Sequence, residues 1–249
     1  MYIENPKTKG SGIFCCIPQT GKCPNGCEDC FFQSGRSYLE PLDQNLPNMP
    51  DPDEVSRYGW VVRVNDGNDS NVHREHVVSS VQRYPRRFYN TALPNDLGGF
   101  DAPVVLTLNP GTMTDESFHK LDDPIPPNLM FVRFRTNTWN VILAGDAVDY
   151  YTVRGVPVVL TFMAYFKTAS DIPEPERIGY VFRKRTLNSY HAITTEAWQE
   201  VMDAHRLNKL VHSCGRVEGE LGDTKCRYCG NCLREWHVAT ERMRTGGQR

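Results

Sequence analysis

The stretch from Met130 to Phe162 decides the fold class, because two apolar segments flank a helical one. The first segment reads MFVRFR (130–135) and the last reads VPVVLTF (156–162), both rich in the β-branched and aromatic residues that favour strands. Between them, the sequence predicts a helix that Thr138 caps, that runs to about Val153 and that stops at Gly155. A strand, a helix and a second strand in this order are typical of a parallel α/β protein.

The same alternation extends toward the N-terminus. Four further strands are predicted at residues 13–17, 60–64, 87–90 and 104–108. Helices are predicted from near Asp53, at residues 71–83, and from Thr114, where acidic residues in the first turn suit the helix dipole. Connections between parallel strands are right-handed, so the strands should curl one way into a sheet or barrel.

Small polar residues follow several of these strands. They are Asn65-Asp66, Asn90-Thr91, Asn109 and Thr136-Asn137. In parallel α/β barrels the carboxyl ends of the strands line the mouth of the active site. Asn and Asp also form turns readily, so this pattern has a purely structural alternative.

After Lys167 the character of the chain changes. Residues 168–177 carry prolines and charges and are expected to form a linker, followed by a short strand at 180–182 and an amphipathic helix over 194–207. We therefore predict one domain over residues 1–170 and a C-terminal extension over 171–249. Residues 234–249 are basic and are expected to form a solvated, frayed end.

Composition narrows the classes of protein. The chain has 249 residues and a formal charge of −2 with both signs spread along it, so no global field indicates nucleic acid or membrane. No apolar run approaches the roughly 18 residues that span a bilayer, and the N-terminus carries no signal-peptide pattern. We expect a cytoplasmic protein, in which the nine cysteines serve as metal ligands rather than disulfides.

The first cysteine group lies in CPNGCEDC (23–30), where Cys23, Cys27 and Cys30 share one short loop. Structural zinc requires four ligands, and Cys15, Cys16 or a histidine could supply the fourth, so zinc stays open. An iron–sulfur cube held by three thiolates instead leaves one iron open to another ligand. Gly26 would let the loop adopt positive φ and wrap such a cube closely.

The Cys-x-x-x-Cys-x-x-Cys spacing, directly after the first predicted strand, resembles the radical S-adenosylmethionine (radical SAM) superfamily. The resemblance covers the motif specifically and residues 13–166 only as an architecture. It implies a partial (β/α)6 TIM-like barrel and a [4Fe–4S] cluster on Cys23, Cys27 and Cys30. S-adenosylmethionine would chelate the open iron, and its reductive cleavage would give methionine and a 5′-deoxyadenosyl radical. That radical would abstract a hydrogen atom from a substrate that the sequence does not identify.

The resemblance also suggests cofactor contacts and a reductant such as a flavodoxin or ferredoxin. The family's aromatic residue before the third cysteine is replaced here by Asp29, so Phe31 or Phe32 would cover the adenine. The family's Gly-Gly-Glu-like string is replaced by NDGND (65–69), so Asn65 or Asp66 would contact the methionine amino group by position.

Two further pairs are candidate cofactor contacts because each pair shares one face of a strand. Thr107 and Asn109 could hold the ribose, and Arg133 and Arg135 could clamp the methionine carboxylate. An ordinary salt bridge or a surface position is the alternative for the two arginines.

The second cysteine group comprises Cys226, Cys229 and Cys232, with Cys214 as the natural fourth ligand. The two-two spacing matches the first three ligands of bacterial ferredoxins and favours a second, auxiliary [4Fe–4S] cluster. Zinc remains the alternative, since four cysteines suit it too. Cys15 and Cys16 are expected to be small buried hydrophobes within the first strand.

Two functions follow from these patterns. The leading hypothesis is a radical SAM enzyme with an auxiliary cluster. The alternative is a non-catalytic zinc or iron–sulfur protein that binds nucleic acid or a partner through its basic C-terminal tail.

Overall fold

The computed structural model describes residues 1–27, 30, 32, 38–109, 118–165, 169–184, 189–215 and 226–246. The strands, in chain order, are β1 (Ile13–Cys16), β2 (Val61–Val64), β3 (Arg87–Thr91), β4 (Val104–Leu108), β5 (Leu129–Thr136), β6 (Val158–Phe162), β7 (Tyr180–Arg183), β8 (Tyr190–Ile193) and β9 (Val211–Ser213). The α-helices are α1 (Leu42–Asn45), α2 (Pro52–Tyr58), α3 (Arg74–Val81), α4 (Val141–Thr152), α5 (Thr195–Asp203), α6 (Cys226–Cys229) and α7 (Asn231–Thr245).

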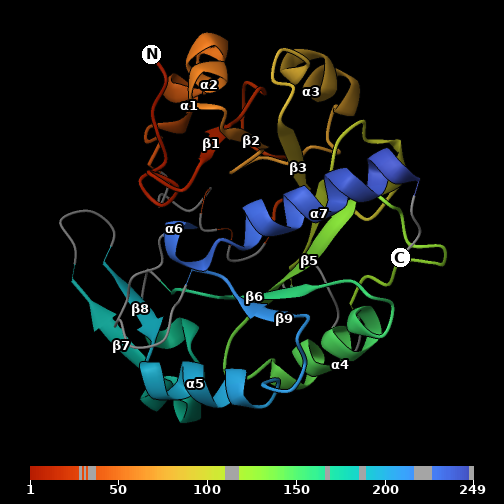
Figure 1. The fold of residues 1–249 in the computed structure, drawn as a ribbon. Helices are drawn as coiled ribbons and strands as arrows, with labels where there is room; N and C mark the ends of the chain where they lie inside the picture. The colour runs from red at the N-terminus through yellow and green to blue at the C-terminus, as the bar shows by residue number, and fades with distance from the viewer. Residues whose placement is uncertain are drawn as a thin grey trace.

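Seven strands form one sheet in the order β1-β2-β3-β4-β5-β6-β9, and every neighbouring pair is parallel. The sheet curls into a half-barrel (Figure 1). This confirms the predicted parallel α/β class. The predicted count of six strands needs a correction, because β9 joins the sheet beside β6 from the segment expected to form an extension.

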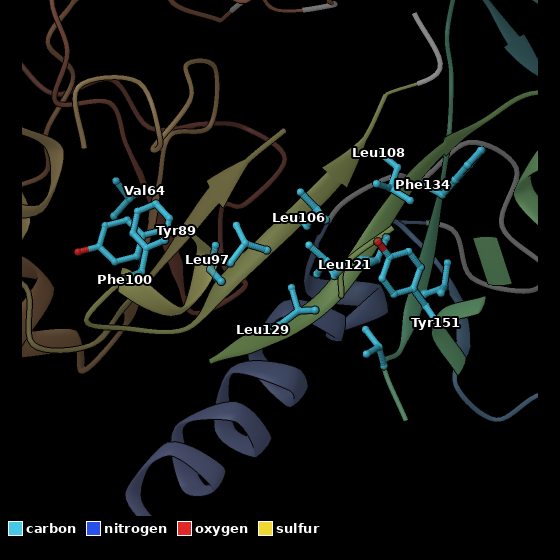
Figure 2. Close-up of a cluster of buried hydrophobic side chains, with 14 of the residues drawn as sticks. Val64, Tyr89, Leu97, Phe100, Leu106, Leu108, Leu121, Leu129, Phe134 and Tyr151 are labelled. Atoms are coloured by element: carbon cyan, nitrogen blue, oxygen red, sulfur yellow. The ribbon is translucent and has the colours of Figure 1, made fainter. Parts of the chain in front are cut away.

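The convex face of the sheet carries the main core. Side chains that alternate along the strands, such as Val62, Leu106 and Phe134, pack there against apolar residues of α2, α3, α4 and α5. Figure 2 shows this cluster continuing from Tyr89 and Phe100, whose ring centroids lie 4.7 Å apart, to Tyr151 on α4. Strands of a parallel sheet that are covered on both faces require such continuous apolar runs.

The concave face is covered by α7, which crosses the sheet in Figure 1. Cys232, Trp236 and Ala239 on this helix pack against inward-facing residues of β1 to β6: Ile13, Val61, Phe88, Val105, Met130, Phe131 and Val159. The Trp236 indole nitrogen also donates to the Arg87 carbonyl oxygen at 2.9 Å. The frayed end expected over residues 234–249 is therefore wrong for residues 234–245, which belong to the packed helix α7.

Other boundaries differ from the predictions in smaller ways. Asn140, rather than Thr138, precedes the first residue of α4, and the Asn140 carboxamide oxygen accepts from the Asn137 backbone nitrogen at 2.9 Å. β7 confirms the strand at 180–182, but β8, its antiparallel partner, was not predicted. The helix expected from Thr114 lies outside the described residues, apart from Phe118. The boundary near residue 170 stays a prediction, although β9 and α7 both pack with the sheet.

Within the described ranges, no helix combines the length and the apolar character needed to cross a membrane.

Replacing Trp236 by alanine should destabilise the fold strongly. The side chain is 7% exposed and fills the concave face, so its loss leaves a cavity and removes a hydrogen bond. We expect the free energy of unfolding to fall by about 3–5 kcal/mol, measured by urea denaturation. Val238→Ala on the outer side of the same helix, where Val238 is 52% exposed, should change it by less than about 0.5 kcal/mol. Similar values for the two variants would show that α7 is not part of the core.

Candidate functional site

The concave face carries polar side chains toward the carboxyl ends of the strands. Side chains alternate between the two faces of a strand. A strand residue beside each of these polar side chains belongs to the convex-face cluster, so the polar side chains face the concave side. The inward-facing polar residues are therefore Arg63, Asn90, Thr107, Arg133, Arg135 and Thr161. α7 covers the apolar part of this face, so the polar part is the candidate site.

Two arginines of β5 contact asparagines at the carboxyl ends of β3 and β4. Arg133 donates to the Asn90 carboxamide oxygen at 3.5 Å, and Arg135 donates to that of Asn109 at 3.3 Å. Asn90 in turn donates to the Asn65 carbonyl oxygen at 3.1 Å. The structure thus links Asn65, Asn90 and Asn109, from the carboxyl ends of β2, β3 and β4, to arginines of β5.

Asn65 and Asp66 follow β2 directly. Asn65 has a φ of +62°, and its side-chain nitrogen donates to the Ser70 hydroxyl at 3.1 Å. Its carboxamide oxygen is buried and has no hydrogen-bond partner among the described residues. Such a buried acceptor is available to a donor that the site would bind.

Asp66 forms an ion pair with Arg63, and both side chains are about nine-tenths buried. The other carboxylate oxygen of Asp66 accepts from the Asn5 side chain. Burial acts to lower the pKa of Arg63, but the Asp66 carboxylate and the nearby Cys15, Cys226 and Cys232 sulfurs together hold that pKa above its ordinary value. Asp66, predicted to contact the methionine amino group, therefore already compensates a buried cation.

The first cysteine group lies on the loop that follows β1. The Cys30 backbone nitrogen donates to the Cys27 carbonyl oxygen at 3.2 Å, and Gly26 adopts a φ of +57°, as expected for a tight wrap. Burial raises the pKa of Cys23 to about 11, and the neighbouring Cys27 and Cys30 thiols contribute in the same direction. The three cysteines are thus close enough to interact electrostatically.

The loop after β2 holds this cysteine loop in place through Asp69. The Asp69 carboxylate accepts from the Asn25 side chain at 3.0 Å, from the Thr91 hydroxyl at 2.7 Å, and from the backbone nitrogens of Ala92 and Asn71 at 2.7 and 2.8 Å. Burial raises the pKa of Asp69, while these four donors oppose the shift. Asn25 lies between Cys23 and Cys27, so Asp69 fixes the segment that carries both.

Further contacts tie the same two loops together. The Gln19 side chain donates to the Asp69 carbonyl oxygen at 2.8 Å, and Asn68 donates to that of Gly21 at 3.3 Å. A Cβ on Gly67 would come within 2.2 Å of the Phe32 ring, so only glycine admits this packing. Phe32 is 4% exposed in an apolar cluster with Ile17, Leu39 and Leu42. Phe31, the other candidate for covering an adenine, lies outside the described residues.

The second cysteine group lies near Arg63. Cys214 follows β9, Cys226 and Cys229 lie on α6, and Cys232 begins the buried face of α7. Burial raises the pKa of Cys226 to about 12; the Arg63 guanidinium opposes this, and the other three thiols add to it. Burial also raises the pKa of Cys232, which Arg133 and Arg63 oppose. The four thiols therefore lie within electrostatic range of one another and of two guanidinium groups.

The two remaining cysteines are fully buried, as predicted. Cys16 packs in the convex-face core. Cys15 faces inward, and its sulfur accepts from Arg63 at 3.2 Å and lies 3.5 Å from the Thr8 hydroxyl.

Among the described side chains, no three His, Cys, Asp or Glu residues are arranged to hold a metal ion. A tetrahedral zinc ion requires thiolate sulfurs about 3.8 Å apart. The cysteine sulfurs of a four-iron cube lie further apart, because each binds a different corner. Thiols are the donors that such a cube requires. The first cysteine group supplies three of them, and the second group supplies four.

Three residues of the candidate site were not predicted from the sequence: Arg63, Asp69 and Asn25. A signal existed for Arg63, because a charged residue in the strand VVRV (61–64) must be paired when it is buried. For Asp69 and Asn25 the sequence offers no comparable signal, because their contact joins two loops 44 residues apart.

Comparisons with known proteins identify no relative: no family model, no curated protein and no solved structure matches the chain.

Replacing Asp69 by alanine should leave four donors without their acceptor. The Thr91 hydroxyl is buried and the other three donors are partly buried, and donors left unsatisfied there are costly, so we expect the free energy of unfolding to fall by about 2–4 kcal/mol, measured by urea denaturation. Asp122→Ala, at an exposed position, should change it by less than about 0.5 kcal/mol. A neutral result for Asp69→Ala would show that the two loops are not held by this carboxylate.

Proposed function

We propose that this protein is a radical SAM enzyme with an N-terminal [4Fe–4S] cluster and an auxiliary cluster. The observation that carries the proposal is the position of Cys23, Cys27 and Cys30. They lie, at the superfamily's spacing, on the loop that leaves β1 beside the polar concave face of a parallel half-barrel. In that position a bound cluster would supply the electron that cleaves S-adenosylmethionine.

The residues of this chain would bind and orient the cofactor. Cys23, Cys27 and Cys30 would hold the N-terminal cluster, and Asp69 and Asn25 keep their loop in place. The buried, unpartnered oxygen of Asn65 would accept from the methionine amino group. Asp66 would add to this through a remaining lone pair, since each of its oxygens already accepts one hydrogen bond.

The opposite wall of the site would hold the rest of S-adenosylmethionine. Arg133 or Arg135 would pair with its carboxylate, because a guanidinium forms two parallel hydrogen bonds to such a group. Thr107 and Asn109 would face the ribose. Both arginines already contact strand-end asparagines, which hold the guanidinium groups near the mouth of the half-barrel.

The second cluster would be held by Cys214, Cys226, Cys229 and Cys232. Four thiolates leave a four-iron cube with a net negative charge, and Arg63 and Arg133 lie where they would compensate it. The proposal also includes a (β/α)6 partial barrel, a flavodoxin or ferredoxin as reductant, and a reducing cytoplasm that keeps the thiols available to metal.

Metal analysis under anaerobic conditions tests this proposal. The reconstituted protein should contain about eight irons per chain, from two four-iron clusters, and should form 5′-deoxyadenosine with S-adenosylmethionine and dithionite. The Cys27→Ala variant should retain about four irons, because it removes a ligand of the N-terminal cluster only. This variant should form no 5′-deoxyadenosine.

Cys16→Ala is the matched control, since Cys16 packs in the convex-face core away from the site. It should retain both clusters and the cleavage reaction. Two zinc ions per chain and no 5′-deoxyadenosine in the unmodified protein would contradict the proposal and favour a non-catalytic metal-binding protein.

A further inference from the structure

The β7–β8 hairpin stands at the mouth of the half-barrel. An antiparallel bridge pairs the backbone of Tyr165, which follows β6, with the backbone of His191 on β8. The Asn137 side chain, just after β5, donates to the Tyr165 hydroxyl at 3.1 Å. The hairpin is therefore anchored to the carboxyl ends of β5 and β6, and Figure 1 shows it on the same side of the molecule as α6.

Aromatic rings lie both at this mouth and on the hairpin. Trp139 packs on Tyr165 with ring centroids 5.2 Å apart, and Phe182 packs on His191 at 5.2 Å. The inner end of the hairpin is buried, since Tyr180 and Ile193 belong to an apolar cluster. Farther out, Phe182 is 56% exposed and Trp139 is 37% exposed. Each ring thus packs on one side against a neighbouring ring and leaves part of its surface open to a ligand.

The same hairpin is basic. Arg183 and Lys184 follow Phe182 directly, and no Asp or Glu occurs between Glu176 and Glu196. The chain as a whole carries a formal charge of −2, so this local excess of positive charge departs from the average. A ligand that complements this positive charge carries negative charges along its length.

Exposed rings beside cations match single-stranded nucleic acid. Unpaired bases stack on aromatic side chains, whereas the backbone phosphates pair with Lys and Arg. An acidic peptide would satisfy the cations but would leave the rings without flat partners. A duplex would offer phosphates but keep its bases stacked inside.

We propose that the β7–β8 hairpin binds single-stranded nucleic acid, with Phe182 stacking on a base and Arg183 and Lys184 contacting phosphates. The proposal rests on the proposed function in one respect: it names nucleic acid as the substrate class presented to the mouth of the half-barrel. Neither the composition nor the net charge of the chain indicates this ligand.

Fluorescence anisotropy with labelled 12-nucleotide RNA and DNA strands of mixed sequence tests the proposal on the full, reconstituted chain. We expect Phe182→Ala to weaken binding of at least one strand about tenfold, because a stacked base is lost. We expect Arg183→Ala/Lys184→Ala to reduce the salt slope of binding by about 1.4, which is about 0.7 for each phosphate contact. The RNA and DNA arms show which sugar the hairpin prefers.

Two exposed control positions match these changes. Ile178→Ala removes an apolar side chain that is 91% exposed, and Lys209→Ala removes an exposed cation just before β9. Both should leave affinity and salt slope unchanged, and circular dichroism should confirm that all variants are folded. Equal losses in the controls, no effect of Phe182→Ala, or equally tight binding of poly-glutamate or duplex would overturn the proposal.

The same preparations separate this proposal from the function on which it rests. A protein that cleaves S-adenosylmethionine but binds neither strand overturns the hairpin proposal alone. A protein whose binding depends on Phe182 but that forms no 5′-deoxyadenosine supports the hairpin as a nucleic-acid surface and overturns the enzymatic proposal.

Discussion

Arg63 places a positive charge inside the half-barrel, where water does not reach it. A buried charge must be paired with an opposite charge nearby, and Asp66, three residues along the chain, forms this ion pair. This pairing fixes the start of the loop after β2, and the same loop carries Gly67 and Asp69, which hold the first cysteine loop. Arg63 also lies within electrostatic range of Cys226 and Cys232 of the second group. One buried guanidinium therefore relates two cysteine groups that lie at opposite ends of the sequence.

The C-terminal helix determines what the concave face can do. α7 fills the apolar part of this face with Trp236 and Ala239, so only the part near the carboxyl ends of the strands remains polar. Because Cys232 belongs to the buried side of α7, packing of the helix also positions the second cysteine group. Stability and site geometry are thus coupled through one helix. The basic, aromatic β7–β8 hairpin then extends the mouth of the site along the β5–β6 side.

Much of the sheet could be predicted from the sequence, because buried parallel strands are short apolar runs separated by turn residues. β4 matches its predicted bounds, and β1, β2 and β5 differ by a residue or so. β9 was missed because VHS (211–213) is too short and polar to stand out, and it forms only because β6 offers an open edge. α7 had a signal, since Cys232, Trp236, Ala239 and Met243 recur at helical spacing, but its many charges suggested a frayed tail. For the site, cysteine spacing predicted both groups, whereas the Asp69–Asn25 contact depends on tertiary structure.

In the proposed enzyme, three N-terminal thiolates would hold an iron cluster with one iron free of any protein ligand. Diffraction from anaerobic crystals of the reconstituted protein, measured on both sides of the iron and zinc absorption edges, would show which metal these thiolates bind. We predict an iron signal bounded by the sulfurs of Cys23, Cys27 and Cys30, with one iron bound by no protein side chain. A single zinc signal held by these three sulfurs and a fourth side chain would contradict the account.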